Sequence, residues 1–472
     1  MFSEDQKNQF YLQLLTISDE KTKILISNSR KEVSTLTRKR QDTTLYHGLP
    51  AVYIEGDWVV FSPYSQQIIH LSEEGMEDSD VITQLKEAGF FSEPSVTGPG
   101  EHASCYQTIL ITTNACNLEC IYCFAFDGTG PQYMSDEVAR AAVRYCINMA
   151  SSRSKEPLIS FFGGEPTLTI QQIEMVIGYA RSLSKAAGSP TPSFSISTNG
   201  VMSEHALDVL LDNNFSITLS MDGLPEIQNL QRPMHQGVPT APRVEATIKE
   251  LACADADFFV RTTVTGHSVE TIPDAVAHLA SLGVKRVHFE AINVAGRAMM
   301  PTKGEVPLKP DAVKFASALI EAIKIGDGLD VGIMNSSYMN MLQPSAHFCD
   351  GAGGNRIAVT PNGEVTACLE VQGSCHPSSN TFLIGRYDEN KGELTIDPTK
   401  KQSLCSLVIP EINQECASCF AKYICGGGCP IRNIHASGDP TKPDQFNCTV
   451  TKEVLPFVIG LVDRYSNRRE GC

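Results

Sequence analysis

Three cysteines lie close together in the chain as Cys116, Cys120 and Cys123, with three and then two residues between them. Three thiolates at this spacing can hold three irons of a cubane cluster and leave the fourth iron open to atoms of a substrate or cofactor. A structural zinc loop is the alternative interpretation. Zinc loops usually close with a fourth Cys or His at short range, and none follows Cys123 in the next twenty residues or so.

This triplet resembles the signature of the radical S-adenosylmethionine (SAM) superfamily, and the resemblance extends over residues 108–330. It implies that the amino and carboxylate groups of SAM chelate the open iron of a [4Fe-4S] cluster. It also implies that an electron from the cluster cleaves SAM to a 5′-deoxyadenosyl radical, which abstracts a hydrogen atom from the substrate. The protein would supply position and exclude water. Cys116, Cys120 and Cys123 are therefore the expected catalytic and metal-binding residues.

A second motif, Gly163-Gly164-Glu165-Pro166, follows an apolar stretch that reads as a strand. Glycines allow backbone carbonyls to approach a ligand, and Glu165 offers an anionic acceptor for an ammonium group. The motif resembles the one that contacts the SAM amino group in the family. Tyr122 matches the family's aromatic residue near adenine, with packing in the core as the alternative.

Two later strand ends carry further polar residues. Ser197 and Asn199 resemble the polar tip that contacts the SAM ribose, because hydroxyl and amide groups can bond its oxygens. Ser220 and Arg232 resemble the residues that touch the SAM carboxylate and ribose in the peptide-modifying and sulfatase-maturing branch, and Arg suits bidentate binding of a carboxylate.

The C-terminal part of the chain holds a second group of cysteines at ordered spacings. They are Cys349, Cys368, Cys416, Cys419, Cys425, Cys429 and Cys448. This order resembles the SPASM extension of radical SAM peptide maturases, which carries two auxiliary [4Fe-4S] clusters. A zinc knuckle is the alternative, because C-x2-C alone also suits zinc.

The resemblance implies one closed and one incomplete ligand set. Auxiliary cluster II would use the set Cys416, Cys419, Cys425 and Cys448. Auxiliary cluster I would use the set Cys349, Cys368 and Cys429. The family's fourth ligand of cluster I falls on Gln343, so its iron is open or is closed by Cys375 or Cys405. Leu369 stands where sulfatase maturases carry their proposed Asp base, which argues against formylglycine formation.

Composition restricts the class of protein. Sixteen cysteines in 472 residues, with an N-terminus unlike a signal peptide, predict a cytoplasmic protein whose clustered cysteines bind metal. No apolar stretch approaches the roughly 20 residues needed to span a bilayer. The net charge of −16 and the single short basic run at 38–40 argue against nucleic acid as a partner.

The elements that must position these residues fall into three parts. From residue 108, six strands alternate with helices, which predicts an α/β domain with a parallel sheet, curved or closed as a partial (β/α)6 barrel. Arg261 and Glu290 lie on its later strands and would face the barrel mouth. Before it, we expect strands at 51–53, 58–61 and 67–71, helices at 10–27 and 81–91, and a linker at 94–100. From about residue 345 the chain is loop-rich, with few helices before 449–465.

We therefore expect a peptide-recognition domain at 1–100, a radical SAM barrel at 101–335 and a SPASM domain at 336–472. The N-terminal part resembles leader-binding domains of maturases of ribosomally made peptides, in which a leader peptide adds as an extra strand. The expected reaction is a thioether or carbon–carbon cross-link in a precursor peptide, with flavodoxin or ferredoxin as electron donor. A sulfatase-type maturase, another SPASM dehydrogenase and a non-catalytic iron–sulfur electron carrier are the alternatives.

Overall fold

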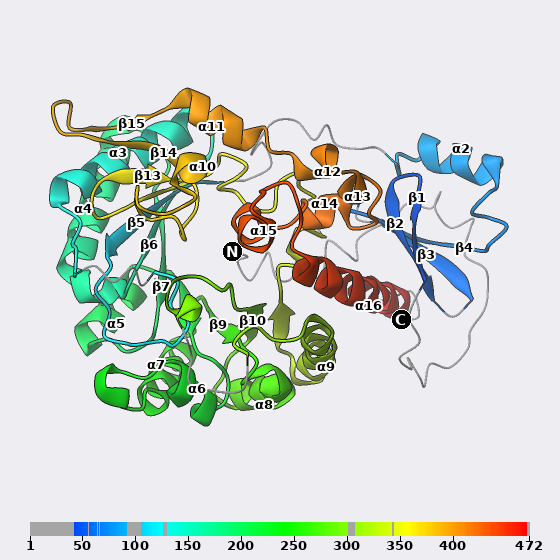
Figure 1. The fold of residues 1–472 in the computed structure, drawn as a ribbon, viewed down its shortest axis with the longest axis horizontal. Coiled ribbons are helices and arrows are strands. Elements are labelled where there is room, and N and C mark those ends of the chain that lie inside the picture. Colours follow the sequence, from blue (N-terminus) through cyan, green and yellow to red (C-terminus); the bar gives the residue numbers. More distant parts are fainter. Residues whose placement is uncertain are drawn as a thin grey trace.

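The computed structural model describes residues 42–469, with gaps at 55, 64, 66, 92–104, 126–129, 301–306 and 342–343, and with side chains as far as residue 463. The expected helix at 10–27 and the linker at 94–100 lie outside the described residues. Figure 1 shows a large α/β body with a small sheet beside it, and helix α16 between the two.

The small sheet comes from the N-terminal part of the chain. Its antiparallel strands follow the order β1-β2-β3-β4. The elements are β1 (Thr43–Tyr46), β2 (Leu49–Ile54), β3 (Asp57–Ser62), β4 (Gln67–Leu71) and helix α2 (Ser79–Glu87). The three expected strands are confirmed, and β1 is an addition. Helix α2 begins two residues earlier than predicted because the side chain of Asp78 accepts hydrogen bonds from the first backbone N–H groups.

The central part alternates strands and helices as expected. Its elements are β5 (Cys105–Thr113), α3 (Asp136–Ser152), β6 (Glu156–Gly163), α4 (Ile170–Ala187), β7 (Ser193–Thr198), α5 (Glu204–Asp212), β8 (Ser216–Ser220), α6 (Pro225–Gln231), α7 (Ala241–Cys253), β9 (Phe258–Val264), α8 (Ile272–Ser281), β10 (Arg286–Ala291), α9 (Ala312–Leu329) and β11 (Gly332–Met334). Strands β5 to β11 pair in parallel in sequence order, and the sheet stays open because β5 pairs with β12 rather than β11.

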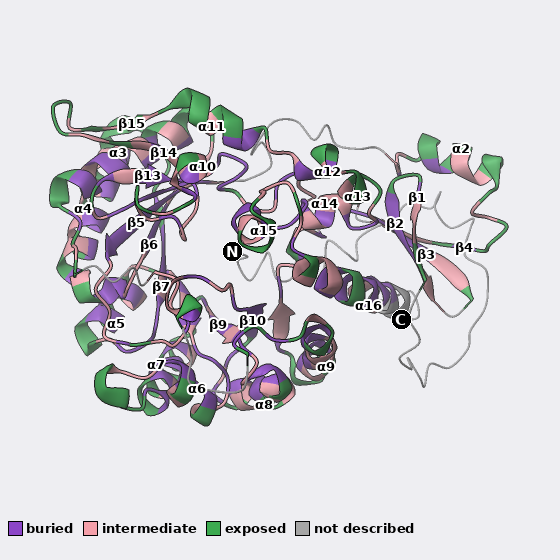
Figure 2. Ribbon diagram, viewed as in Figure 1, coloured by how far each residue is buried: buried purple, intermediate pink, exposed green. Residues whose placement is uncertain are grey.

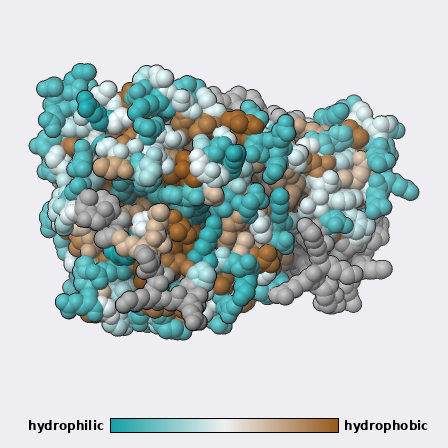
Figure 3. Space-filling view, viewed as in Figure 1, coloured by the Kyte–Doolittle hydropathy of each residue, from teal (hydrophilic) through white to brown (hydrophobic). Residues whose placement is uncertain are grey.

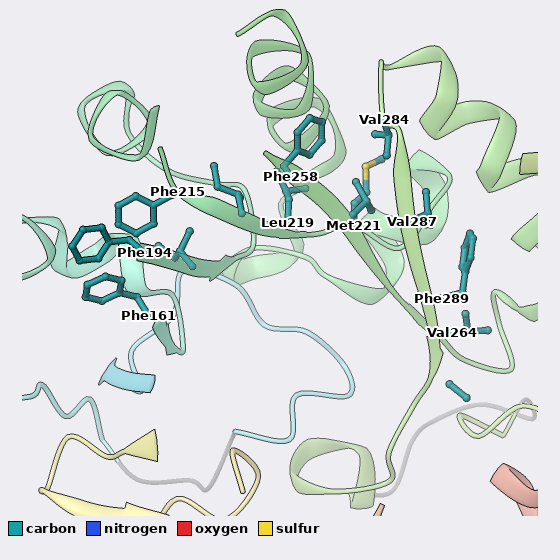
Figure 4. Packing of buried hydrophobic residues seen from close by; sticks show 14 of the residues in the cluster. Phe161, Phe194, Phe215, Leu219, Met221, Phe258, Val264, Val284, Val287 and Phe289 are labelled. Carbon is teal, nitrogen blue, oxygen red and sulfur yellow. The ribbon is translucent and has the colours of Figure 1, made fainter. Parts of the chain in front are cut away.

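Burial alternates along two inner strands of this curved sheet, β8 and β9. In β9, every second residue from Phe258 to Val264 is buried and the residues between are partly exposed. The buried residues pack under the surrounding helices, and the others face the lumen of the partial barrel. Figure 4 shows part of the packed side, where Phe161, Phe194 and Phe215 lie beside one another. The lumen is therefore the accessible side of the sheet.

The C-terminal part contains more regular structure than the sequence indicated. Its elements are β12 (Arg356–Val359), β13 (Glu364–Thr366), α10 (Ser379–Phe382), β14 (Leu383–Asp388), β15 (Glu393–Ile396), α11 (Pro398–Cys405), α12 (Ile409–Ile412), α13 (Gln414–Ala417), α14 (Lys422–Cys425), α15 (Pro430–Ser437) and α16 (Gln445–Arg469). Strands β12 to β15 extend the central sheet to eleven strands. Strands this short show too little periodicity to be recognised from sequence.

Helix α16 connects the small sheet to the body. Val454 and Leu455 of α16 belong to the same buried cluster as Val52, Val59 and Phe61 of the sheet. The opposite face of the sheet packs on α2 through a second cluster. Figure 2 shows buried residues concentrated in the strands and exposed ones on the outer helix faces. The small sheet is therefore covered on both faces.

Polar side chains cover most of the molecular face in Figure 3, with apolar residues gathered near its middle. Among the described helices, none is both long enough and apolar enough to cross a membrane.

Candidate active site and cluster-binding cysteines

The loop with Cys116, Cys120 and Cys123 begins just after β5, at the carboxyl end of the parallel strands. Neighbouring segments hold its backbone in place. The N–H of Ile121 donates to the carbonyl of Gln231 at 2.9 Å. From the β10 side, the Arg297 guanidinium donates to the carbonyl of Cys120 at 2.7 Å, and its backbone N–H donates to the carbonyl of Cys123 at 2.9 Å. These hydrogen bonds hold the loop at the carboxyl end of the parallel strands.

The thiols of this loop lie together and are partly buried. Burial raises the pKa of Cys116 to about 12 and that of Cys120 to about 11, and the neighbouring cysteines of the triplet contribute to both shifts. A thiol has to lose its proton to bind iron, and the charge of the metal drives that loss. Three grouped thiols fit a cluster that keeps one iron open.

Gly163 and Gly164 pack directly against the start of this loop. A Cβ atom on Gly163 would lie 2.1 Å from the carbonyl oxygen of Thr113, and one on Gly164 would lie 2.1 Å from that of Ala115. The backbone N–H groups of Gly164 and Glu165 donate to those same two carbonyls, each at 2.8 Å. Only glycine permits this approach, so the two motifs recognised in the sequence form one unit.

Glu165 is fully buried, and its carboxylate is occupied by the chain itself. It accepts from the backbone N–H of Thr167 at 3.1 Å and its hydroxyl at 2.7 Å, from the Thr198 hydroxyl at 2.9 Å, and from the N–H of Asn199 at 2.7 Å. Burial raises its pKa and these hydrogen bonds oppose the rise. In this structure Glu165 joins the loop after β6 to the loop after β7.

The side chain of Asn199 turns toward the cysteine loop. Its amide donates to the Asn117 side chain at 2.7 Å and to the sulfur of Cys116 at 3.7 Å. Ser197 is partly exposed on the lumen side of β7. The structure therefore places Asn199, just after β7, beside the cysteines, and Ser197 two residues earlier on β7.

Tyr122 and Arg232 meet at a carboxylate that the sequence analysis did not single out. The Tyr122 hydroxyl donates to Asp222, and Arg232 Nε lies 3.0 Å from the other oxygen of that carboxylate. The guanidinium also lies over the Tyr122 ring, 5.3 Å from its centre. All three residues are buried. Ser220, at the end of β8, remains partly exposed. Arg232 is therefore a paired cation next to the cysteine loop.

The four cysteines expected for cluster II line one shared hollow. They come from α13, the following turn, the end of α14 and the first turn of α16, and are Cys416, Cys419, Cys425 and Cys448. Among the described residues, no three His, Cys, Asp or Glu side chains converge closely enough to hold a single metal ion. Thiols spread around a hollow fit a polynuclear cluster better than one zinc ion.

The three cysteines expected for cluster I also lie within electrostatic reach of one another. Cys429 and Cys349 contribute to the raised pKa of Cys368, which burial dominates. The Arg356 guanidinium lies among the same three cysteines, and its pKa is raised by them although burial lowers it. The groups that influence the buried Cys405 thiol are instead Lys401 and Arg153. Cys375 is exposed. Gln343 lies outside the described residues.

Three consecutive glycines, Gly426, Gly427 and Gly428, separate Cys425 from Cys429. All three have φ between +62° and +81°, a conformation that side chains other than glycine rarely adopt. This left-handed run turns the chain sharply, so that Cys425 faces the hollow with Cys416 while Cys429 joins Cys368.

Leu369 occupies the position of the maturase base, and the next residue is acidic. The Glu370 carboxylate, whose side chain is 9% exposed, contacts the His435 ring and the side-chain amide of Asn293. It thereby ties the turn after Cys368 to α15 and to the loop after β10.

The sequence analysis missed the residues that link these segments across long distances. Asp222 and Arg297 lie beside the cysteine triplet, Arg356 among the cluster I cysteines, and Arg432 next to Glu290. For Asp222, the signal available in the sequence was an acidic residue close behind the end of a predicted strand. Arg432 offered one signal of its own, since it follows Cys429 by three residues.

Comparison with known proteins identifies the central part. The Radical SAM superfamily model matches residues 110–294. The Cysteine-type anaerobic sulfatase-maturating enzyme of Clostridium perfringens is 24% identical over 367 residues, which cover 73% of this chain and 94% of that one. The Serine-type anaerobic sulfatase-maturating enzyme of Klebsiella aerogenes is 25% identical over 342 residues, which cover 69% and 79%.

A solved structure shares the fold. Native anSMEcpe with bound AdoMet and Cp18Cys peptide superposes with a TM-score of 0.61 at 22% identity, over 77% of this chain and 99% of that one. Residues 110–294 of this chain are therefore a radical SAM domain whose relatives include anaerobic sulfatase-maturating enzymes.

Proposed function

We propose that this protein is a radical SAM enzyme that removes a hydrogen atom from a precursor peptide and forms a thioether or carbon–carbon cross-link in it. The observation that carries the proposal is the fixed loop of Cys116, Cys120 and Cys123, with Gly163 and Gly164 pressed against it. When bound, the cluster and SAM supply a 5′-deoxyadenosyl radical for hydrogen abstraction. The residues of the chain hold the loop, orient SAM and limit the access of water.

The contacts around the cysteine loop suggest how SAM is oriented. Gly163 and Gly164 hold the loop after β6 against the backbone of the cysteine loop, and Ser197 and Ser220 present hydroxyls from the lumen side of their strands. Asn199 bonds the loop itself, so its role is to position Cys116 as well as to meet the ribose. Tyr122 and Arg232 share Asp222 and form a rigid wall on the other side.

The two further cysteine sets support an oxidative outcome. Formation of a cross-link removes two hydrogen atoms from the peptide: one is abstracted, and the other leaves as a proton and an electron. The hollow lined by Cys416 and Cys425 suits a closed cluster that transfers the electron. Cys349, Cys368 and Cys429 would hold the second auxiliary cluster next to the lumen, since Arg432, three residues after Cys429, contacts Glu290. Flavodoxin or ferredoxin would supply the electron that cleaves SAM.

The small N-terminal sheet is the proposed leader-binding unit. Both faces are covered, by α2 and by α16, so a peptide would have to add at an edge. Among the described strands, β1 and β4 each have one neighbour and form the two edges. A leader that adds there should protect the amide hydrogens of one edge strand from exchange, and a peptide without its leader should not.

A sulfatase-type maturase is the second candidate, and the curated relatives favour it. The residue after Cys368 argues against it, because Leu369 cannot act as a base. A sulfatase peptide with Cys or Ser at the modified position tests this candidate directly. Conversion of that residue to formylglycine would support it over cross-linking.

The experiment for the proposed function uses the reconstituted protein under anoxic conditions with dithionite and SAM. Formation of 5′-deoxyadenosine separates an enzyme from a non-catalytic electron carrier. If a small open reading frame lies beside the gene, the peptide that it encodes is added, and the product should be lighter by two hydrogen atoms in mass spectrometry. Absence of 5′-deoxyadenosine from protein with a full iron content would contradict the proposal.

A further inference from the structure

Arg261 is a cation in the lumen of the partial barrel that forms no direct ion pair with a carboxylate of the described residues. It lies on β9, level with Ser220 of β8 and His288 of β10. Its side chain belongs to the partly exposed, lumen-facing set of that strand. Among the described residues, no Asp or Glu oxygen lies within 4.0 Å of its guanidinium, and the contact found is with His288 Nδ1 at 3.3 Å.

That contact determines the charge of His288. A guanidinium N–H can only donate, so Nδ1 of His288 accepts and the ring proton lies on Nε2. Nε2 lies 3.2 Å from the Glu290 carboxylate and donates to it. Burial and the nearby cations lower the pKa of His288, in agreement with a neutral ring. The ring therefore orients Arg261 without neutralising it.

The nearest carboxylates have other partners. Glu290 accepts from Arg432 at 2.6 Å and from the Ser336 hydroxyl at 3.0 Å, and it is 5% exposed. Asp222 is paired with Arg232. Two guanidinium–carboxylate pairs thus cancel, and one positive charge remains on Arg261. Burial lowers the pKa of Arg261, and the negative charge of Glu290, which is already paired with Arg432, opposes that lowering only in part.

A partly buried cation without a counter-ion is costly unless an anion arrives with a ligand. Arg261 lies within electrostatic reach of Tyr122 and Arg232 beside the cysteine triplet, and of Arg432 near Cys429. A planar guanidinium binds a carboxylate with directional, charge-assisted hydrogen bonds. Accordingly, we propose that Arg261 binds a carboxylate of the peptide substrate and so selects a peptide with an acidic group near the modified residue.

This inference rests on the proposed function, because it takes the substrate to be a peptide. The carboxylate has two sources, an Asp or Glu side chain and the C-terminus of a peptide. Three probes separate them: acetyl-Ala-Asp-Ala-amide, acetyl-Ala-Asn-Ala-amide, and acetyl-Ala-Asn-Ala with a free C-terminus. Binding of each to the reconstituted protein with SAM is measured by anoxic calorimetry.

In the wild-type protein, one or both of the carboxylate probes should bind about tenfold or more tightly than the neutral probe, as expected for one charge-assisted hydrogen-bonded pair. The preference should disappear in R261Q and return in part in R261K, which restores a positive charge. K285Q is the matched control, since Lys285 is an exposed cation at the start of the next strand and its loss should leave the preference intact.

Two results with the probes would overturn the proposal: equal binding of the three probes by the wild-type protein, or a preference that survives in R261Q. Binding of SAM is measured in parallel. If R261Q loses affinity for SAM by the same factor as for the carboxylate probe, the anion at Arg261 belongs to SAM and the proposal fails. Neither result depends on 5′-deoxyadenosine formation, so failure of the proposed function would be recognised separately.

Discussion

The backbone N–H of Asn199 donates a hydrogen bond to the buried carboxylate of Glu165 at 2.7 Å, across 34 residues of sequence. This bond joins the loops that follow β6 and β7. Because Asn199 also bonds Asn117 in the cysteine loop, three segments recognised separately in the sequence depend on one carboxylate. Glu165, which was expected to contact SAM, thereby also has a structural role.

Substitution of Glu165 by Gln should destabilise the protein by about 1–3 kcal/mol. Both carboxylate oxygens of Glu165 accept hydrogen bonds, so the NH₂ group of Gln would face at least one N–H or O–H donor and leave it without an acceptor. Thermal unfolding measures the loss, and SAM affinity should fall with it. The control is E174Q, which alters an exposed carboxylate on α4. Equal stability of E165Q and E174Q would contradict the role assigned to Glu165.

Replacement of Cys116, Cys120 and Cys123 together by Ala should abolish SAM cleavage and leave the auxiliary clusters in place. Three cubanes give about twelve irons per chain, so the variant should retain about eight. Iron analysis and 5′-deoxyadenosine formation are the two measurements. Cys253→Ala is the control, since this thiol is exposed on α7. Retention of about four irons would rule out two auxiliary clusters.

Gly427→Ala should prevent the turn between Cys425 and Cys429. A Cβ atom there would lie 2.4 Å from Ile409, and φ is +78°. Gly438 has the same φ, but no atom lies within 4 Å of where its Cβ would be. Gly438→Ala should therefore destabilise the protein by about 1–2 kcal/mol, which is the cost of a left-handed backbone for a residue other than glycine. Loss of iron from G427A but not from G438A is the expected result. Full iron in both variants would show that the steric contact is relieved cheaply.

Attachment of the small sheet to α16 should weaken as pH rises. His70 of β4 lies 2.8 Å from Asp463, and this hydrogen bond raises the pKa of His70 above its ordinary value of 6.5. A raised pKa in the folded state gives stability that is fully present below pH 6.5 and is lost as pH rises through the folded-state pKa. The side chain is 38% exposed, so the effect should stay below about 1 kcal/mol.

Hydrogen exchange in β4 and α16 at pH 5.5 and pH 8.5 measures this change. The exchange rates at the sheet–helix contact, corrected for the intrinsic effect of pH, should rise at the higher pH. H70Q should remove most of the difference while the buried contacts of Val52 and Val59 remain. A wild-type difference that persists in H70Q would assign the pH effect to another group.

The motifs and the strand–helix alternation were predictable because they are local in the chain. The spacing of Cys116, Cys120 and Cys123, the Gly163-Gly164 pair and the alternation of strands with helices are all encoded within short windows of sequence. Each short window carries its own periodicity or ligand geometry. The six expected barrel strands and the grouping of the late cysteines follow from such windows.

Contacts between distant segments were decided only by the tertiary structure. Strand β12 adds to β5 across some 250 residues, and Arg432 reaches Glu290 across 142. Asp222 pairs with Arg232, and Arg261 forms no ion pair with a carboxylate of the described residues. Which charge is cancelled depends on which side chains the folded chain brings within a few ångströms. Electrostatic pairing falls off with distance in space and is indifferent to distance along the chain.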